Sequence, residues 1–193
     1  MLAMRRVCAT IPRHQNRYGS GFQMLSDTCL KLHRDLGISP DYASVRGLPA
    51  YEEAQELVEV GPNLVGRMQR LTPRAAARWQ EMASAAGAAD VRLLIVSGFR
   101  THEYQAELIR KKLGSGQTLD EILCVNAAPG FSQHHTGEAV DIATPGSRPL
   151  TEDFETSAAY GWLQEHAGRF GFSMTYPRDN PWGFVHEPWH WSL

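Results

Sequence analysis

The chain has 193 residues, enough for one compact domain with a sizeable core and few for two. Its 42% hydrophobic and 21% charged residues are typical of a globular protein and argue against a mostly disordered or collagen-like chain. Nineteen basic and twenty-one acidic residues give a net charge of −2, too balanced to attract nucleic acid through bulk charge. We therefore expect a single globular unit with no nucleic-acid partner, and we also expect it to be a monomer.

No export signal or membrane span is visible in the sequence. Arg5 and Arg6 are followed by Pro12, Arg13 and His14, where a signal peptide needs an uninterrupted apolar core. The longest apolar stretch, residues 91–96, is far shorter than the ~20 residues that a membrane span requires. On sequence alone we expect a cytoplasmic protein, or one whose targeting segment is not part of this sequence.

Glycines and prolines interrupt residues 1–70, so we expect short helices and irregular segments there, as an N-terminal extension to a core at 71–193. Within that core, apolar spacing and the positions of glycine and proline predict four helices, at 72–86, 102–113, 119–125 and 156–170. Short β-branched or alternating runs predict four strands, at 91–96, 139–143, 172–176 and 184–192. This order of elements indicates an α+β fold with a small, mostly antiparallel sheet flanked by helices.

Five of the eight histidines lie between His134 and the C-terminal end of the chain. His134 precedes Asp141 by seven residues, and Glu187 precedes His190 by three. Two imidazole nitrogens and one carboxylate oxygen suit catalytic Zn²⁺, and a second carboxylate can deprotonate a metal-bound water. Spacing alone leaves the alternative open that His134 and Asp141 form an ordinary surface or capping pair.

Three motifs in a fixed order resemble those of a known family. The first is Ser97-Gly98-Phe99-Arg100-Thr101, followed by Tyr104 and Gln105; the second is Ser132, His134, Gly137, Ala139 and Asp141; the third is Glu187, Trp189 and His190. From Leu71 to the end, the chain resembles the VanY type of zinc D-alanyl-D-alanine carboxypeptidases. The wider group includes lysostaphin-like endopeptidases and the hedgehog signalling domain.

The resemblance implies a hedgehog/D-Ala-D-Ala peptidase-like fold whose sheet carries one Zn²⁺ per chain. By position, the metal ligands are His134, Asp141 and His190, and Glu187 is the general base. Arg100 is implied to bind the terminal carboxylate of the substrate or to stabilise the oxyanion, and both roles stay open.

Three further residues match positions that contact substrate in the family. Gln105 and Ser132 are implied to donate hydrogen bonds to the substrate, and Tyr176, which precedes Pro177, is implied to form a wall of its site. The alternatives are a surface helix residue for Gln105 and a turn cap for Ser132.

The implied reaction is hydrolysis of the terminal D-Ala-D-Ala bond of peptidoglycan stem peptides or muropeptides. An L,D-carboxypeptidase and an endolysin-like peptidoglycan endopeptidase are alternatives with the same residues around the metal. A non-catalytic zinc-containing binding or signalling module is an alternative of another class, and the presence of Glu187 favours an enzyme over it. Such a substrate lies in the cell envelope or periplasm, in contrast to the location expected from the sequence.

Overall fold

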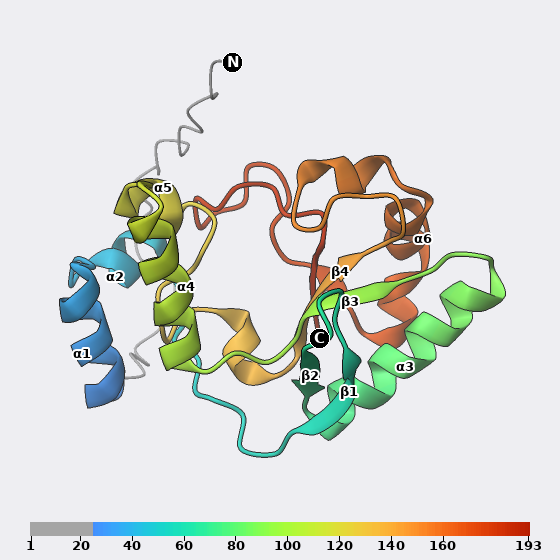
Figure 1. The fold of residues 1–193 in the computed structure, drawn as a ribbon, viewed down its shortest axis with the longest axis horizontal. Coiled ribbons are helices and arrows are strands. Elements are labelled where there is room, and N and C mark those ends of the chain that lie inside the picture. The colour runs from blue at the N-terminus through green and yellow to red at the C-terminus, as the bar shows by residue number, and fades with distance from the viewer. Residues whose placement is uncertain (1–24) are drawn as a thin grey trace. The chain divides into compact units, whose positions relative to one another are not determined.

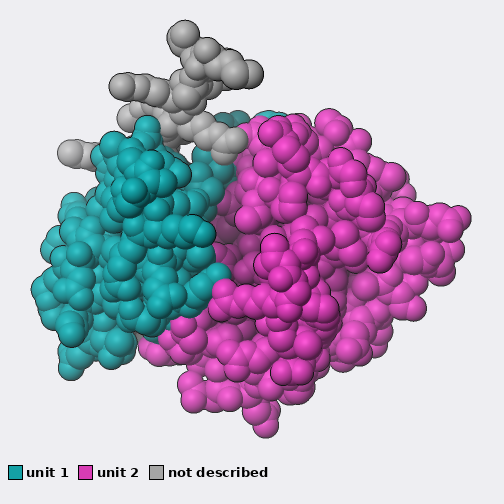
Figure 2. Space-filling view, in the orientation of Figure 1, with its two compact units in different colours: residues 1–51, 102–132, 178–185 teal, residues 52–101, 133–177, 186–193 magenta. Residues whose placement is uncertain are grey.

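The computed structural model describes residues 25–193, which form two compact units (Figure 2). The described part of unit 1 is built from residues 25–51, 102–132 and 178–185, and unit 2 from 52–101, 133–177 and 186–193. Residues 1–24, to which the expectation about an export signal refers, lie outside the described part. Within that part, no helix combines the length and apolar character needed to cross a membrane.

Unit 1 is helical. Its helices are α1 (Asp27–Leu36), α2 (Tyr42–Arg46), α4 (His102–Gly114) and α5 (Leu119–Leu123) (Figure 1). The Ser26 side chain caps α1 by accepting from the backbone N–H of Cys29. A buried contact of 3.0 Å between Cys29 Sγ and His102 Nδ1 joins α1 to the first turn of α4.

Unit 2 contains a four-stranded antiparallel sheet with the order β3-β4-β6-β5. The strands are β3 (Leu94–Ser97), β4 (Ala139–Ala143), β5 (Ser173–Met174) and β6 (His190–Ser192). In this register Asp141 lies opposite Ser97 on β3 and opposite His190 on β6. Directly opposed residues project from the same face of a sheet, so the register brings the side chains of Asp141 and His190 together.

The core of unit 2 forms between the sheet and two helices, α3 (Pro73–Ala88) and α6 (Ala158–His166). Val140 and Ile142 on β4 are fully buried in the same cluster as Met82 of α3 and Leu163 of α6. Alternation along β4 therefore directs Val140 and Ile142 into this core and Asp141 to the opposite face.

Unit 2 also contains a β-hairpin, β1 (Val58–Pro62) and β2 (Met68–Leu71), in a region where we expected short helices and loops. The Asn63 side chain stabilises its turn by accepting from the backbone N–H groups of Val65 and Arg67. The strands are short and exposed on one side, which explains why their apolar pattern gave no clear strand signal.

The α+β class and the antiparallel sheet are confirmed, and the boundaries differ at particular places. Helix α3 begins after the Thr72 cap as expected but continues through Gly87, because the chain turns only at Asp90, which has a φ of 57°. The strand expected at 184–192 is limited to β6, and the one at 172–176 to β5, because only those residues pair with a neighbour.

Truncating the core leucine of α6 should destabilise the protein. Leu163 is fully buried, so Leu163→Ala is expected to lower the free energy of unfolding by about 2–5 kcal/mol through lost burial and an unfilled cavity. Urea denaturation measures this change. The matched variant Leu64→Ala removes the same atoms from a side chain that is 46% exposed and should cost less than about 1 kcal/mol. Equal losses in the two variants would contradict the assignment of Leu163 to the core.

Candidate active site

The carboxylate of Asp141 lies at the centre of a buried cluster on unit 2. Its Oδ1 is 3.0 Å from His190 Nδ1, and its Oδ2 is 3.2 Å from His134 Nε2. One ligand atom from each of these three residues lies within 4.8 Å of the others, and all three residues are buried. Two imidazole nitrogens and a carboxylate oxygen at this separation can hold a divalent metal ion, and the set is one that Zn²⁺ accepts.

His134 is oriented by a backbone hydrogen bond. It belongs to the 3₁₀ turn η1 (Gln133–Thr136), and its Nδ1–H donates to the carbonyl of Gly98 at 2.7 Å. This bond directs Nε2 to Asp141, and Nε2 is buried without a hydrogen-bond partner of suitable geometry among the described residues. A buried nitrogen of this kind costs free energy unless something binds it, and a metal ion satisfies it.

Gly98 is required for this arrangement. A Cβ atom at this position would lie 2.7 Å from the backbone oxygen of Arg70. The backbone of the segment after β3 is held at this close approach by two more bonds, from Gly98 N–H to Gln69 Oε1 and from Phe99 N–H to Arg70 O. The hairpin β1–β2 thus fixes the carbonyl that orients His134.

His190 is held from two sides. Its Nδ1 faces Asp141, and its Nε2 lies 2.9 Å from the side-chain oxygen of Gln133. The ring of Tyr176 packs against it with centroids 4.9 Å apart, and the ring of His134 meets it edge-on at the same distance.

Burial and charge set the protonation of the cluster. Burial, reinforced by the Arg100 guanidinium, lowers the pKa of His134 to about 4 although Asp141 favours its charged form. At neutral pH its Nε2 therefore carries a lone pair. Burial would raise the pKa of Asp141, but the neighbouring His134, His190 and Arg100 outweigh burial and hold that pKa well below its usual range. The cluster thus offers a neutral imidazole and an ionised carboxylate, the forms that bind metals.

Arg100 joins the cluster through both its side chain and its backbone. Its Nη2 donates to Asp141 Oδ2 at 3.3 Å. Its backbone N–H donates to His134 O, and its carbonyl accepts from Nδ1–H of His135 at 2.7 Å. The fully buried His135 ring therefore supports the backbone of Arg100.

Glu187 lies on the segment that leads into β6, three residues before His190. It is buried, and its backbone N–H donates to Tyr176 O at 3.0 Å while its carbonyl accepts from His190 N–H at the same distance. The cluster of candidate ligands among the described residues consists of His134, Asp141 and His190, so Glu187 is not one of them.

The structure brings His134, Asp141, His190, Arg100 and Tyr176 together on unit 2. Gln105 on α4 and Ser132 belong to unit 1, and the geometry within unit 2 does not bear on their predicted substrate contacts.

Gln105 is not a surface helix residue, since it is 1% exposed and donates to Ala127 O at 2.8 Å. Ser132 is also buried. Sequence reasoning did not single out Gln133 or assign a partner to His135, because neither position has a fixed residue in the motif.

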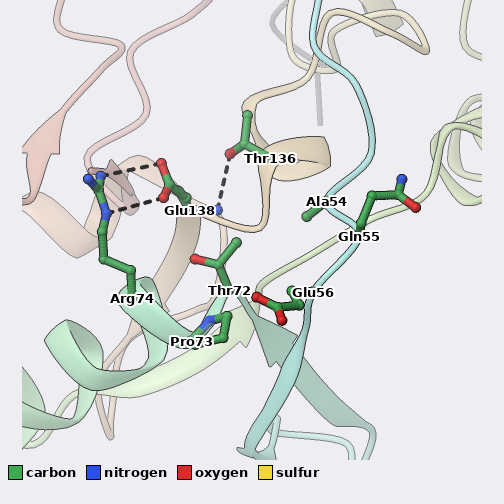
Figure 3. A pocket seen from close by; sticks show the side chains of 8 residues that line it. All are labelled: Ala54, Gln55, Glu56, Thr72, Pro73, Arg74, Thr136 and Glu138. Atoms are coloured by element: carbon green, nitrogen blue, oxygen red, sulfur yellow. Dashed lines mark hydrogen bonds and ion pairs between the residues drawn. The ribbon is translucent and has the colours of Figure 1, made fainter.

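A separate hollow of about 460 Å³ lies beside the loop that carries His134 (Figure 3). Its lining residues are Ala54, Gln55, Glu56, Thr72, Pro73, Arg74, Thr136 and Glu138. Arg74 and Glu138 form an ion pair at one side of this hollow, with Arg74 Nε 3.2 Å from Glu138 Oε1. None of the candidate ligands lines it, and we place the chemistry at the Asp141 cluster instead.

The depressed pKa of His134 predicts that acid destabilises the metal-free protein. The folded state binds this proton only near pH 4, whereas the unfolded state binds it near pH 6.5. The contribution of His134 to the free energy of unfolding is therefore fully present above pH 6.5. It is lost as the pH falls towards 4, by up to about 1.4 kcal/mol per pH unit. Urea denaturation with a chelator present, between pH 6.5 and 5, measures the slope. His134→Gln should make it shallower, and an unchanged slope would contradict the assignment.

The chain is similar to several known proteins. A sequence profile described as VanY, D-alanyl-D-alanine carboxypeptidase, matches residues 68–193. A D-alanyl-D-alanine carboxypeptidase of Enterococcus faecalis is 34% identical over 133 residues, which are 64% of this chain and 48% of the relative. The chain spans about half the length of the curated relatives that it matches first.

Solved structures show the same relationship. The LdcB LD-carboxypeptidase is 27% identical, with a TM-score of 0.65 over 75% of this chain and 71% of that one. The vancomycin-resistance D,D-pentapeptidase VanY from a VanB-type cassette, a mutant in complex with Zn(II), is 31% identical, with a TM-score of 0.57 over 76% and 82%. VanYB in complex with D-alanine-D-alanine is 32% identical, with a TM-score of 0.57 over 75% and 80%. The chain belongs to the VanY D-alanyl-D-alanine carboxypeptidase family.

Proposed function

We propose that this chain is a zinc-dependent carboxypeptidase that removes the terminal D-alanine from peptidoglycan stem peptides. The observation that carries the proposal is the buried cluster of His134, Asp141 and His190, in which Nε2 of His134 has no hydrogen-bond partner of suitable geometry among the described residues. The relatives support the substrate, since one is named a D-alanyl-D-alanine carboxypeptidase and another was solved with D-alanine-D-alanine. The Zn(II) complex of VanY supports the metal.

His134 Nε2, an oxygen of Asp141 and His190 Nδ1 would hold the zinc ion. These are the atoms that face one another, while the opposite ring nitrogens are held by Gly98 and Gln133. Zinc bound there supplies a Lewis acid that polarises the scissile carbonyl and lowers the pKa of water.

Glu187 is proposed as the general base. Its carboxylate takes a proton from the attacking water and passes it to the amine of the departing D-alanine. Its support is positional: it is buried, it is not one of the clustered ligands, and its backbone is fixed to Tyr176 and His190. Because backbone bonds hold Glu187 close to the ligand His190, the position of Glu187 should not change during the proton transfer.

Arg100 supplies positive charge beside the cluster, 3.3 Å from Asp141 Oδ2. A guanidinium there can stabilise the oxyanion that develops at the scissile carbonyl, or bind the terminal carboxylate one residue away. A preference for a chain end follows from the second role. We also propose Tyr176, Ser132 and Gln105 as substrate contacts, on the basis of their motif positions.

An L,D-carboxypeptidase is the second candidate. It is favoured by the likeness to LdcB, which has a TM-score of 0.65. This enzyme class cleaves one residue further into the stem, so the same residues around the metal would serve it.

Incubation of the protein with defined pentapeptide and tetrapeptide muropeptides separates these functions. Release of D-alanine from the pentapeptide, abolished by a chelator and identified by mass, is the expected result. Release from the tetrapeptide alone would establish the L,D activity instead. No product from either would overturn the enzymatic proposal in favour of a binding module.

Replacing the base should separate metal binding from turnover. Glu187→Gln is expected to retain zinc and to lower kcat by at least about 100-fold, because the amide cannot accept the proton. Elemental analysis and muropeptide kinetics measure the two effects. Glu165→Gln, at a side chain that is 76% exposed, is the matched control and should leave both unchanged.

The ligands are tested in parallel with the double variant His134→Ala, His190→Ala, which should lose zinc. Zinc retained in that variant would place the metal elsewhere, and full activity in Glu187→Gln would place the base elsewhere.

A further inference from the structure

We propose that Gln133 is a positioning residue whose side-chain oxygen holds His190 in the tautomer that presents Nδ1 to the metal. This inference rests on the proposed zinc site and concerns a residue that neither the motif nor the family name assigns. Gln133 Oε1 lies 2.9 Å from His190 Nε2, and the residue is half-buried in the turn next to His134.

The hydrogen-bond chemistry of the ring leaves one arrangement for a metal-binding His190. Its Nδ1 faces Asp141 Oδ1 at 3.0 Å, on the side of His134 Nε2, so Nδ1 is the nitrogen that can share a metal with these residues. A neutral imidazole that gives its Nδ1 lone pair to a metal carries its proton on Nε2. That N–H requires an acceptor, and Gln133 Oε1 is at hydrogen-bond distance from it.

Gln133 is itself held in place. Its backbone carbonyl accepts from the Thr136 hydroxyl at 2.7 Å, and Thr136 Oγ1 accepts in turn from the Glu138 N–H at 3.1 Å. These bonds join the first residue of the turn to its last residue and the last residue to the chain that leads into β4, next to the ligand His134. An acceptor on a fixed backbone loses little freedom when it binds the imidazole, so it can select one tautomer and one ring orientation.

Each of the two histidine ligands then donates one ring N–H to a protein oxygen and presents its other ring nitrogen to the metal, but the acceptors differ. His134 donates its Nδ1–H to the backbone oxygen of Gly98 and presents Nε2, whereas His190 donates its Nε2–H to Gln133 and presents Nδ1. The acceptor for His134 is a backbone oxygen, which no side-chain substitution removes directly. The acceptor for His190 is a side-chain oxygen, which a single substitution of Gln133 removes.

The test measures zinc affinity by competition with a chromophoric chelator. Gln133→Met keeps the length of the side chain but removes the acceptor, and it should weaken zinc binding about 10-fold or more. Gln133→Glu restores an acceptor oxygen and should return the affinity at least to the wild-type level. Gln80→Met, the same change on the exposed face of α3, is the matched control and should bind zinc normally.

The inference would be overturned if Gln133→Met bound zinc as tightly as the wild type. It would also be overturned if Gln133→Met lost zinc affinity and Gln133→Glu did not restore it. A raised KM in Gln133→Met with unchanged zinc affinity would show instead that Gln133 contacts the substrate. Urea denaturation of the metal-free variants separates positioning from misfolding, because a positioning role should change unfolding by less than about 1 kcal/mol. Loss of zinc from Gln133→Met together with retention in the His134, His190 double variant would instead refute the zinc site itself.

Discussion

The ionised carboxylate of Asp141 is the group around which unit 2 is organised. A buried charge is costly unless it is paired and hydrogen-bonded, and Asp141 meets this requirement with three partners from three separate segments. Arg100 follows β3, His134 belongs to the turn before β4, and His190 begins β6. Removing Asp141 would therefore leave these three groups packed around a site with no counter-charge.

The sheet makes this convergence possible. Asp141 lies on the inner strand β4, and the register places His190 directly across from it on β6. The neighbours of Asp141 along β4, Val140 and Ile142, are fully buried in the core on the other face. A register slip of one residue would send Asp141 into that apolar core, so the packing that stabilises the sheet also specifies the site.

Features that depend on residues close together in the sequence were predicted correctly. Strand β4 was predicted with its observed bounds, 139–143, because Pro145-Gly146 ends it, and three of the motif residues are found in one cluster.

The hairpin β1–β2 and the role of Gln69 were not predicted, since a close approach of β2 to Gly98 is a pairing of distant segments. Gln133 was missed for the same reason: its significance lies in a contact with His190, 57 residues away. His135 is buried next to His134 in the 3₁₀ turn η1, and its bond to the Arg100 carbonyl also joins segments that are distant in sequence.

Charge balance links the site to its proposed substrate. Without metal, the guanidinium of Arg100 offsets the carboxylate of Asp141, and the carboxylate of Glu187 lies nearby in sequence on the segment leading to His190. A dication bound there as proposed would leave a positive excess beside the Arg100–Asp141 pair, in a buried setting where charge is weakly screened. A peptide that ends in a free carboxylate neutralises that excess, whereas an internal peptide bond brings no charge. If the chain is the carboxypeptidase proposed above, the same balance that keeps Asp141 ionised would favour cleavage at a chain end.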